Sequence, residues 1–179
     1  MNKRNAQIIG FFITAAAGTL LHFTYKWSGF VLVIGLFAPV NESVWEHLKL
    51  LVVPMLVFAA AEYFTYGSRL RNFWPVRLLS VLLGMGVIVA LYYAWAALAG
   101  ESGMAANIAI FLIGVWAAYA FSAKLLATRR YSSPPARSLS AIGLAILIAA
   151  FAVFSYNPPH FELFRDPQTN AYGPVTETR

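Results

Sequence analysis

Five long apolar runs constrain this chain more strongly than any other feature of its sequence. A helix needs about 20 mostly apolar residues to cross the ~30 Å hydrocarbon core of a bilayer. Five runs have about that length, and they cover residues 8–25, 44–66, 78–99, 105–127 and 139–156. Backbone polar groups in lipid must be paired within the protein, and the runs lack the ~10-residue alternating pattern of barrel strands. The sequence therefore predicts an all-α fold, a polytopic transmembrane bundle of five helices that forms a single membrane domain over residues 1–179.

The composition agrees with this class. Charged residues make up 11% of the chain and hydrophobic residues 60%, whereas about 25% of the residues in a soluble domain are charged. The chain contains no cysteine, which excludes disulfides and thiolate metal ligands.

A sixth apolar stretch, residues 28–40, is too short to cross, because its 13 residues give a helix of only about 20 Å. Lys and Arg collect on the cytoplasmic side of short loops, so their distribution tests this interpretation. If the stretch does not cross, nine basic residues lie on the cytoplasmic side and four on the outer side; if it crosses, the counts become five and eight. The nine are Lys3, Arg4, Arg69, Arg71, Arg77, Lys124, Arg129, Arg130 and Arg137, and the four are Lys26, Lys49, Arg165 and Arg179.

The charge distribution therefore favours five helices, with residues 28–40 forming a re-entrant or interfacial segment. It predicts a multi-pass protein of the cell (inner) membrane whose N-terminus is cytoplasmic and whose C-terminus is extracytoplasmic. Much of the net charge of +6 falls in two inner loops. We expect the partners to be the lipid bilayer and anionic lipids at its cytoplasmic face, not nucleic acid. The sequence indicates no particular protein partner.

Polar side chains gather on the predicted outer face. This face holds all three histidines and six of the seven acidic residues, and only Glu62 is on the cytoplasmic side. His22 lies near the outer end of the first helix. Glu42, Glu46 and His47 lie where the second helix begins, and a polar tail that contains His160, Glu162, Arg165 and Asp166 follows the fifth.

Three outer-face motifs, "HFTYKWSG", "VNESVWEHLKLL" and "PPHFELFRDPQTNAYG", carry a family resemblance. With these motifs at these places, the chain resembles a family of small prokaryotic integral-membrane proteins known only as a domain of unknown function. The resemblance covers most of the chain and implies a polytopic membrane protein. It implies no activity, so it assigns no catalytic role to any residue.

The motif "NESVWEHL" also has a purely structural interpretation. Asn41 or Ser43 can cap the helix, and Ser43 followed three residues later by Glu46 fits a capping box. Glu42 and Glu46 are four residues apart and repel each other on one helix face unless a cation intervenes, and Lys49 is available as that cation. Capping does not account for His47.

The tail after the fifth helix has more structure-forming residues than a solvated tail needs. Pro158 and Pro159 terminate the helix, and Arg165 and Asp166 form a possible local pair in the turn that follows. We predict an ordered outer tail over residues 157–173. If it folds back, it brings His160 and Asp166 over the outer mouth, near His22 and His47.

This convergence predicts a divalent metal site, for example for zinc. Imidazole and carboxylate are the usual zinc ligands, and catalytic zinc takes three protein ligands and keeps one open position. The expected metal ligands are His22, His47, His160 and Glu42, and the expected catalytic residues are Glu46 as general base and Asp166 as the residue that orients a histidine. The motifs contain no HExxH. Such a site would act on a lipid-like or headgroup substrate.

Three alternatives remain open at the level of sequence. One is a metal-free acid–base site made of the same His and Glu residues. Another is a small-solute transporter or channel, although the middles of four of the five predicted helices carry no charge. The third is a non-enzymatic membrane assembly or partner-binding protein. The sequence alone does not decide whether the protein is an enzyme.

Overall fold

The computed structural model describes residues 3–100 and 103–175, and this part of the chain contains helices and no strands. Five helices are long and apolar enough to cross a membrane. They are α1 (Lys3–Trp27), α3 with α4 (Val44–His47 and Lys49–Thr65), α5 (Phe73–Ala99), α6 (Met104–Leu126) and α7 (Pro134–Tyr156). The predicted all-helical class with five apolar helices is confirmed.

α1, α5 and α7 begin before their predicted apolar runs, because a helix can begin with polar or proline-containing residues. α7 begins at Pro134, where Ser133 is the N-cap and its hydroxyl accepts a hydrogen bond from the Ala136 N–H at 3.4 Å. Proline suits a first turn because its missing N–H has no intrahelical partner there. α5 likewise begins at Phe73 and has Pro75 in its first turn. Hydropathy detects only the lipid-facing part of such helices.

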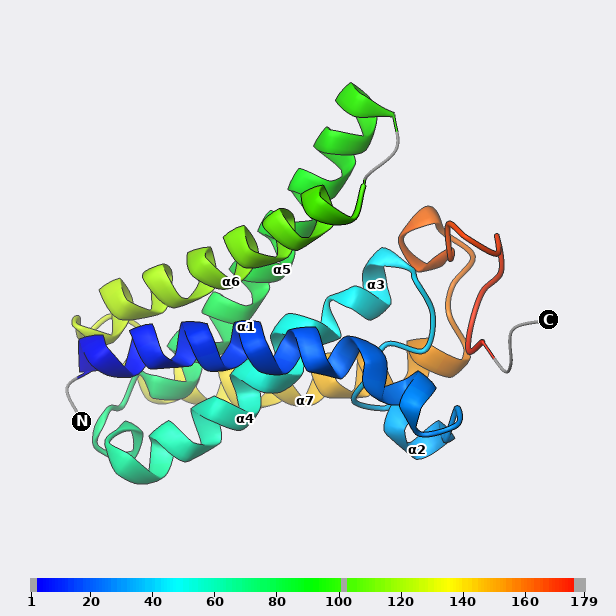
Figure 1. Ribbon diagram of the computed structural model, residues 1–179. Coiled ribbons are helices and arrows are strands. Elements are labelled where there is room, and N and C mark those ends of the chain that lie inside the picture. Colours follow the sequence, from blue (N-terminus) through cyan, green and yellow to red (C-terminus); the bar gives the residue numbers. More distant parts are fainter. Residues whose placement is uncertain (1–2, 101–102, 176–179) are drawn as a thin grey trace.

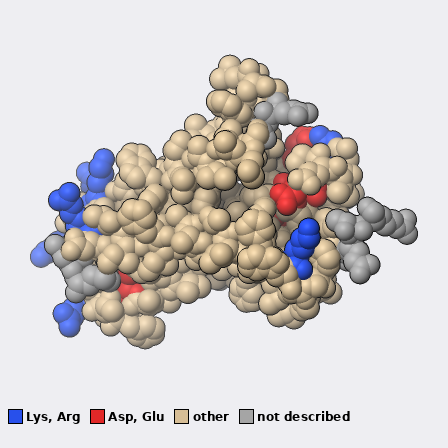
Figure 2. Space-filling view, in the orientation of Figure 1, with Lys and Arg blue, Asp and Glu red and all other residues tan. Residues whose placement is uncertain are grey.

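The bundle has two chemically different ends (Figure 1). We call one the basic end: α1, α5 and α7 begin there, and α4 and α6 finish there. We call the opposite one the site end: it holds the C-terminus of α1, the start of α3 and the tail after α7. Figure 2 shows most Lys and Arg side chains at the basic end and most Asp and Glu side chains at the site end.

Residues 28–40 do not cross the bundle. Gly29 and Phe30 turn the chain with φ of 72° and 62°, and the four-residue helix α2 (Leu32–Gly35) follows. The segment starts and finishes at the site end, where Val33 and Phe37 are 63% and 55% exposed. It therefore has the place and the apolar surface of an interfacial segment.

α1 and α4 approach each other closely at Gly18. Pro54 lies inside α4 and has no N–H to donate to the Leu50 carbonyl one turn earlier. A Cβ atom added at Gly18 would lie 2.4 Å from that carbonyl oxygen, so only glycine fits. Gly84 of α5 and Gly114 of α6 form a similar close contact, as small residues do between membrane helices.

A buried polar network ties four helices together near the basic end. Arg77 of α5 forms an ion pair with Glu62 of α4, and both side chains are buried. Gln7 of α1 donates to Glu62 at 2.9 Å, and Arg77 donates to Ser122 of α6 at 2.9 Å. Glu62 therefore has the structural surroundings expected of a buried charge that is paired and hydrogen-bonded.

Candidate functional site

The loop before α3 is held by local hydrogen bonds, of which the sequence predicts the Ser43 cap. Ser43 is the N-cap of α3, and its hydroxyl accepts a hydrogen bond from the Glu46 N–H at 3.3 Å. The Asn41 side chain accepts from the Ser43 N–H at 2.9 Å. The second half of the expected capping box differs, because the Glu46 carboxylate accepts from the N–H of Val40. The result is a hydrogen-bonded turn that leaves Glu42 outside α3.

Glu46 belongs to a buried ionic network below this turn. Lys49 Nζ lies 2.7 Å from Glu46 Oε2 and also donates to the backbone carbonyl of Gly35 and to the hydroxyl of Ser155. Ser155 of α7 donates in turn to Glu46 Oε1 at 2.8 Å. Both carboxylate oxygens of Glu46 are therefore occupied. Its assignment as a general base stays a prediction, and these contacts favour a structural role.

The tail folds back onto the loop before α3. Asn41 donates to the Gly173 carbonyl at 2.9 Å, and the Val175 N–H donates to the Val40 carbonyl at 3.1 Å. Phe164, in the short 3₁₀ helix η2 (Glu162–Phe164), packs against Trp45 with ring centroids 4.9 Å apart. The tail is thus part of the folded site end.

Asp166 is buried within this tail and positions Glu42. One carboxylate oxygen accepts from the N–H groups of Gln168 and Thr169, and the other accepts from the Glu42 N–H at 3.3 Å. The expected local pairing with Arg165 is not formed, because Arg165 instead pairs with Glu162 at 2.7 Å. Asp166 therefore acts on the backbone of Glu42 and touches no histidine through the bonds described.

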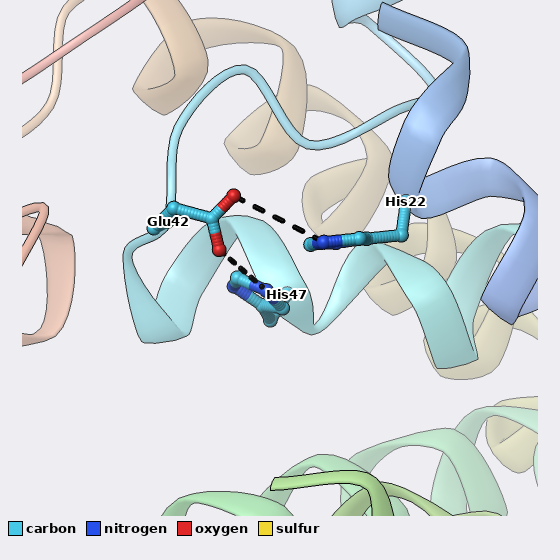
Figure 3. A group of neighbouring side chains, drawn as sticks. All are labelled: His22, Glu42 and His47. Carbon is cyan, nitrogen blue, oxygen red and sulfur yellow. Dashed lines mark ion pairs between the residues drawn. The ribbon is translucent and has the colours of Figure 1, made fainter. Parts of the chain in front are cut away.

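Three side chains from separate parts of the chain form one cluster (Figure 3). His22 comes from α1, Glu42 from the loop and His47 from α3. Glu42 Oε2 lies 3.4 Å from His47 Nε2, and Glu42 Oε1 lies 4.0 Å from His22 Nε2. The two imidazole rings are 5.2 Å apart between centroids. The side chains are about one-third exposed, at 30% for His22, 32% for His47 and 37% for Glu42.

The cluster is partly organised for metal binding. His47 Nδ1–H donates to the Ser43 carbonyl at 2.9 Å, so Nε2, which faces Glu42, is the ring atom that would bind a metal after losing its proton. His22 Nδ1 is buried with no hydrogen-bond partner in the described ranges. The hydrogen bond from His47 lowers the pKa of Glu42, which keeps that carboxylate ionised. The cluster thus offers two imidazoles and one anion.

The geometry fits a tetrahedral ion such as zinc. Bonds of about 2 Å place the ligand atoms of such an ion about 3.3 Å apart. One ligand atom from each of His22, Glu42 and His47 lies within 4.8 Å of the others. The distance of 3.4 Å between His47 Nε2 and Glu42 Oε2 already matches, whereas His22 Nε2, at 4.0 Å from Glu42 Oε1, would have to move inward. Three protein ligands leave a fourth position open.

The structure does not bring His160 to this cluster. It is exposed, and its ring stacks on Tyr172 with centroids 4.4 Å apart. The tail folds back, but the hydrogen bonds that join it to the loop before α3 come from Asp166, Gly173 and Val175 and not from His160. Of the four expected metal ligands, the structure groups His22, Glu42 and His47.

A pocket of about 460 Å³ opens beside the cluster, and its lining includes Glu42 and His47. Other walls come from α5 and α6, including Tyr92 and Asn107, and Gln168 of the tail lies at its rim. Sequence reasoning missed Tyr92 and Asn107 because nothing local links them to the histidines. The available signal was Asn107 itself, an amide side chain in the otherwise apolar first half of α6.

A comparison with known protein families matches residues 1–174 to the family of unknown function DUF6512. The chain belongs to this family. The match covers α1 to α7 and the tail up to residue 174, so His22, Glu42, His47 and the pocket lie within the region shared with DUF6512. No curated protein and no solved structure matches the chain.

Proposed function

We propose that this membrane protein is a divalent-metal protein that holds zinc between His22, Glu42 and His47. The supporting observation is the convergence of these three ligand atoms within 4.8 Å from a helix, a loop and a second helix. A hydrogen bond already orients one of the two imidazoles. By the distribution of Lys and Arg, the site lies on the extracytoplasmic face of the cell membrane.

The proposed activity is metal-dependent chemistry on a lipid-like or headgroup substrate. Zinc bound by three protein ligands supplies a Lewis acid that polarises a phosphoryl or carbonyl oxygen at the open position. The protein's own residues hold that position. Ser43 fixes the His47 ring through its carbonyl, and Asp166 fixes the backbone of Glu42. Ligands that are about one-third exposed beside an open pocket leave room for a substrate to reach the metal.

The test is metal content after purification in detergent with an affinity tag that contains no histidine. We expect wild type to retain about one zinc ion per chain and to lose thermal stability when a chelator is added. His22→Ala and His47→Ala should each weaken zinc binding by more than about 100-fold, because the loss of outer-shell partners alone weakens metal sites about 10- to 100-fold.

His160→Ala is the matched control, since it removes the third histidine without touching the cluster. It should bind zinc like wild type. The proposal fails if wild type binds no stoichiometric zinc. It also fails in this form if His160→Ala loses zinc as completely as His47→Ala, which would mean that the tail supplies a ligand.

A further inference from the structure

The pocket beside the cluster has an apolar floor and a polar mouth. Leu50, Ile88 and Ile110 line it and are nearly completely buried. The polar lining residues are Glu42, His47, Tyr92, Asn107 and Gln168. The volume of about 460 Å³ is in the range of small-molecule sites, which combine apolar walls with a few convergent polar groups.

The pocket lies where membrane-spanning helices separate. The hairpin tip of α5 and α6 projects away from α1 and α7 at the site end (Figure 1), and Figure 2 shows that face hollowed beside the tip. Leu98 and Met104 on the tip are 86% and 79% exposed. Apolar side chains so exposed at the end of a membrane-spanning hairpin suit contact with lipid. An amphiphile can therefore enter the pocket from the bilayer.

The charges of the residues that line the pocket mouth indicate which lipid headgroup it can bind. The described residues that line the pocket include no Lys or Arg, and Glu42 is their one carboxylate. With two neutral imidazoles and this carboxylate, a divalent ion leaves the cluster with a net charge of about +1. The metal is then the cation that an anionic headgroup meets in this pocket.

We propose that the pocket binds a bilayer amphiphile with a phosphate headgroup, with the phosphate at the metal and the hydrocarbon chain along Ile88 and Ile110. The inference rests on the proposed function, because it uses the metal as the headgroup site. It narrows the lipid-like substrate to one with a phosphate headgroup, and it assigns the α5–α6 hairpin to binding of the hydrocarbon chain.

Ala96 offers a way to fill the pocket without changing the metal ligands. Ile88, Tyr92 and Ala96 are spaced by four residues on one face of α5, and all three line the pocket. Ala96→Phe adds a ring to this face. Ala97→Phe is the matched control, because Ala97 is exposed one residue further on and is not part of the lining.

The test measures dissociation constants by calorimetry with zinc-loaded protein in an uncharged detergent. The probes are a short-chain phosphatidic acid, the diacylglycerol with the same chains, and inorganic phosphate. We expect wild type and Ala97→Phe to bind the phosphatidic acid at least about tenfold more tightly than the diacylglycerol, and a chelator to abolish that preference. Ala96→Phe should bind one zinc and inorganic phosphate normally, and the phosphatidic acid at least about tenfold more weakly.

The outcomes separate this inference from the proposed function. Stoichiometric zinc with equal affinity for both lipids, or with an Ala96→Phe affinity like that of wild type, overturns the inference and leaves the metal site standing. The inference is also overturned if Ala96→Phe weakens the binding of inorganic phosphate as much as the binding of the phosphatidic acid, since the pocket would then hold free phosphate. Absence of zinc from wild type overturns the proposed function before any lipid is added. If Ala96→Phe does not fold, Ala96→Leu replaces it, with a smaller loss expected.

Discussion

Glu42 and Glu46 are four residues apart, and their carboxylates serve different partners. Glu42 precedes the N-cap, so it lies outside the helix and faces His22 and His47. Glu46 lies inside α3 and turns into the bundle toward Lys49. The two acids therefore avoid the repulsion of carboxylates stacked on one helix face. One remains available for chemistry, and the other joins the segment before α3 to α7.

The buried pair of Glu46 and Lys49 gives a residue-scale prediction. Removal of one partner leaves an unpaired buried charge, so Glu46→Gln or Lys49→Met should lower the free energy of unfolding by about 3–5 kcal/mol. The double variant should lose less than the two single losses added together, because it buries no unpaired charge. Unfolding by SDS titration in mixed micelles measures all three. Additive losses would contradict the pairing.

The same variants separate the structural from the catalytic role of Glu46. Folded Glu46→Gln should still bind zinc, because Glu46 contributes no atom to the cluster of His22, Glu42 and His47. Loss of zinc from well-folded Glu46→Gln would contradict the structural role and indicate that Glu46 takes part in metal binding.

Residues that act locally were predictable, and residues that act across the fold were not. The Ser43 cap and the Glu46–Lys49 pair follow from spacings of three residues, which a helix brings together whatever its surroundings. The stacking of His160 on Tyr172 depends on the path of the tail, which no periodicity fixes. The sequence thus predicts that all three histidines lie at one end of the bundle. The fold is needed to show that His22 and His47 meet and that His160 stays apart.

At the scale of elements, the contact of α1 with α4 positions the site. Gly18 lies against the Leu50 carbonyl, to which Pro54 has no N–H to donate. His22 is one turn further along the same face of α1. The distance between the two helices at Gly18 therefore sets how far His22 stands from His47. The hydropathy of the sequence predicted both helices. It did not predict their contact, because a glycine in an apolar run does not indicate which helix packs against it.

Gly18→Ala should damage both stability and metal binding. Its Cβ would lie 2.4 Å from a backbone oxygen, so α1 must move outward, which we expect to lower the free energy of unfolding by about 1–3 kcal/mol. Zinc affinity should fall as well, because His22 moves with α1. Gly86→Ala is the control, since nothing lies within 4 Å of its added Cβ, and alanine there should stabilise α5 by up to about 1 kcal/mol. Equal stability of both variants would contradict the close contact.

At the scale of the whole molecule, the charges separate along the long axis of the bundle. Two of the residues counted for topology are buried in ion pairs, Arg77 at the basic end and Lys49 at the site end. If these two are left out, each count falls by one, so the predicted cytoplasmic side still has more basic residues than the outer side. Because the cluster, the pocket and the tail all lie at the site end, orientation in the membrane would decide which compartment supplies the proposed metal.

The orientation is testable with single cysteines, since the natural chain has none to remove. Arg130→Cys marks an exposed loop at the basic end, and Thr169→Cys marks the exposed tail at the site end. The positive-inside rule predicts that a membrane-impermeant maleimide labels Thr169→Cys in right-side-out vesicles and labels Arg130→Cys only after permeabilisation. The reverse pattern would place the intact site in the cytoplasm. Labelling of both before permeabilisation would contradict the crossing of α7, because that one span separates Arg130 from Thr169 and puts them on opposite sides of the membrane.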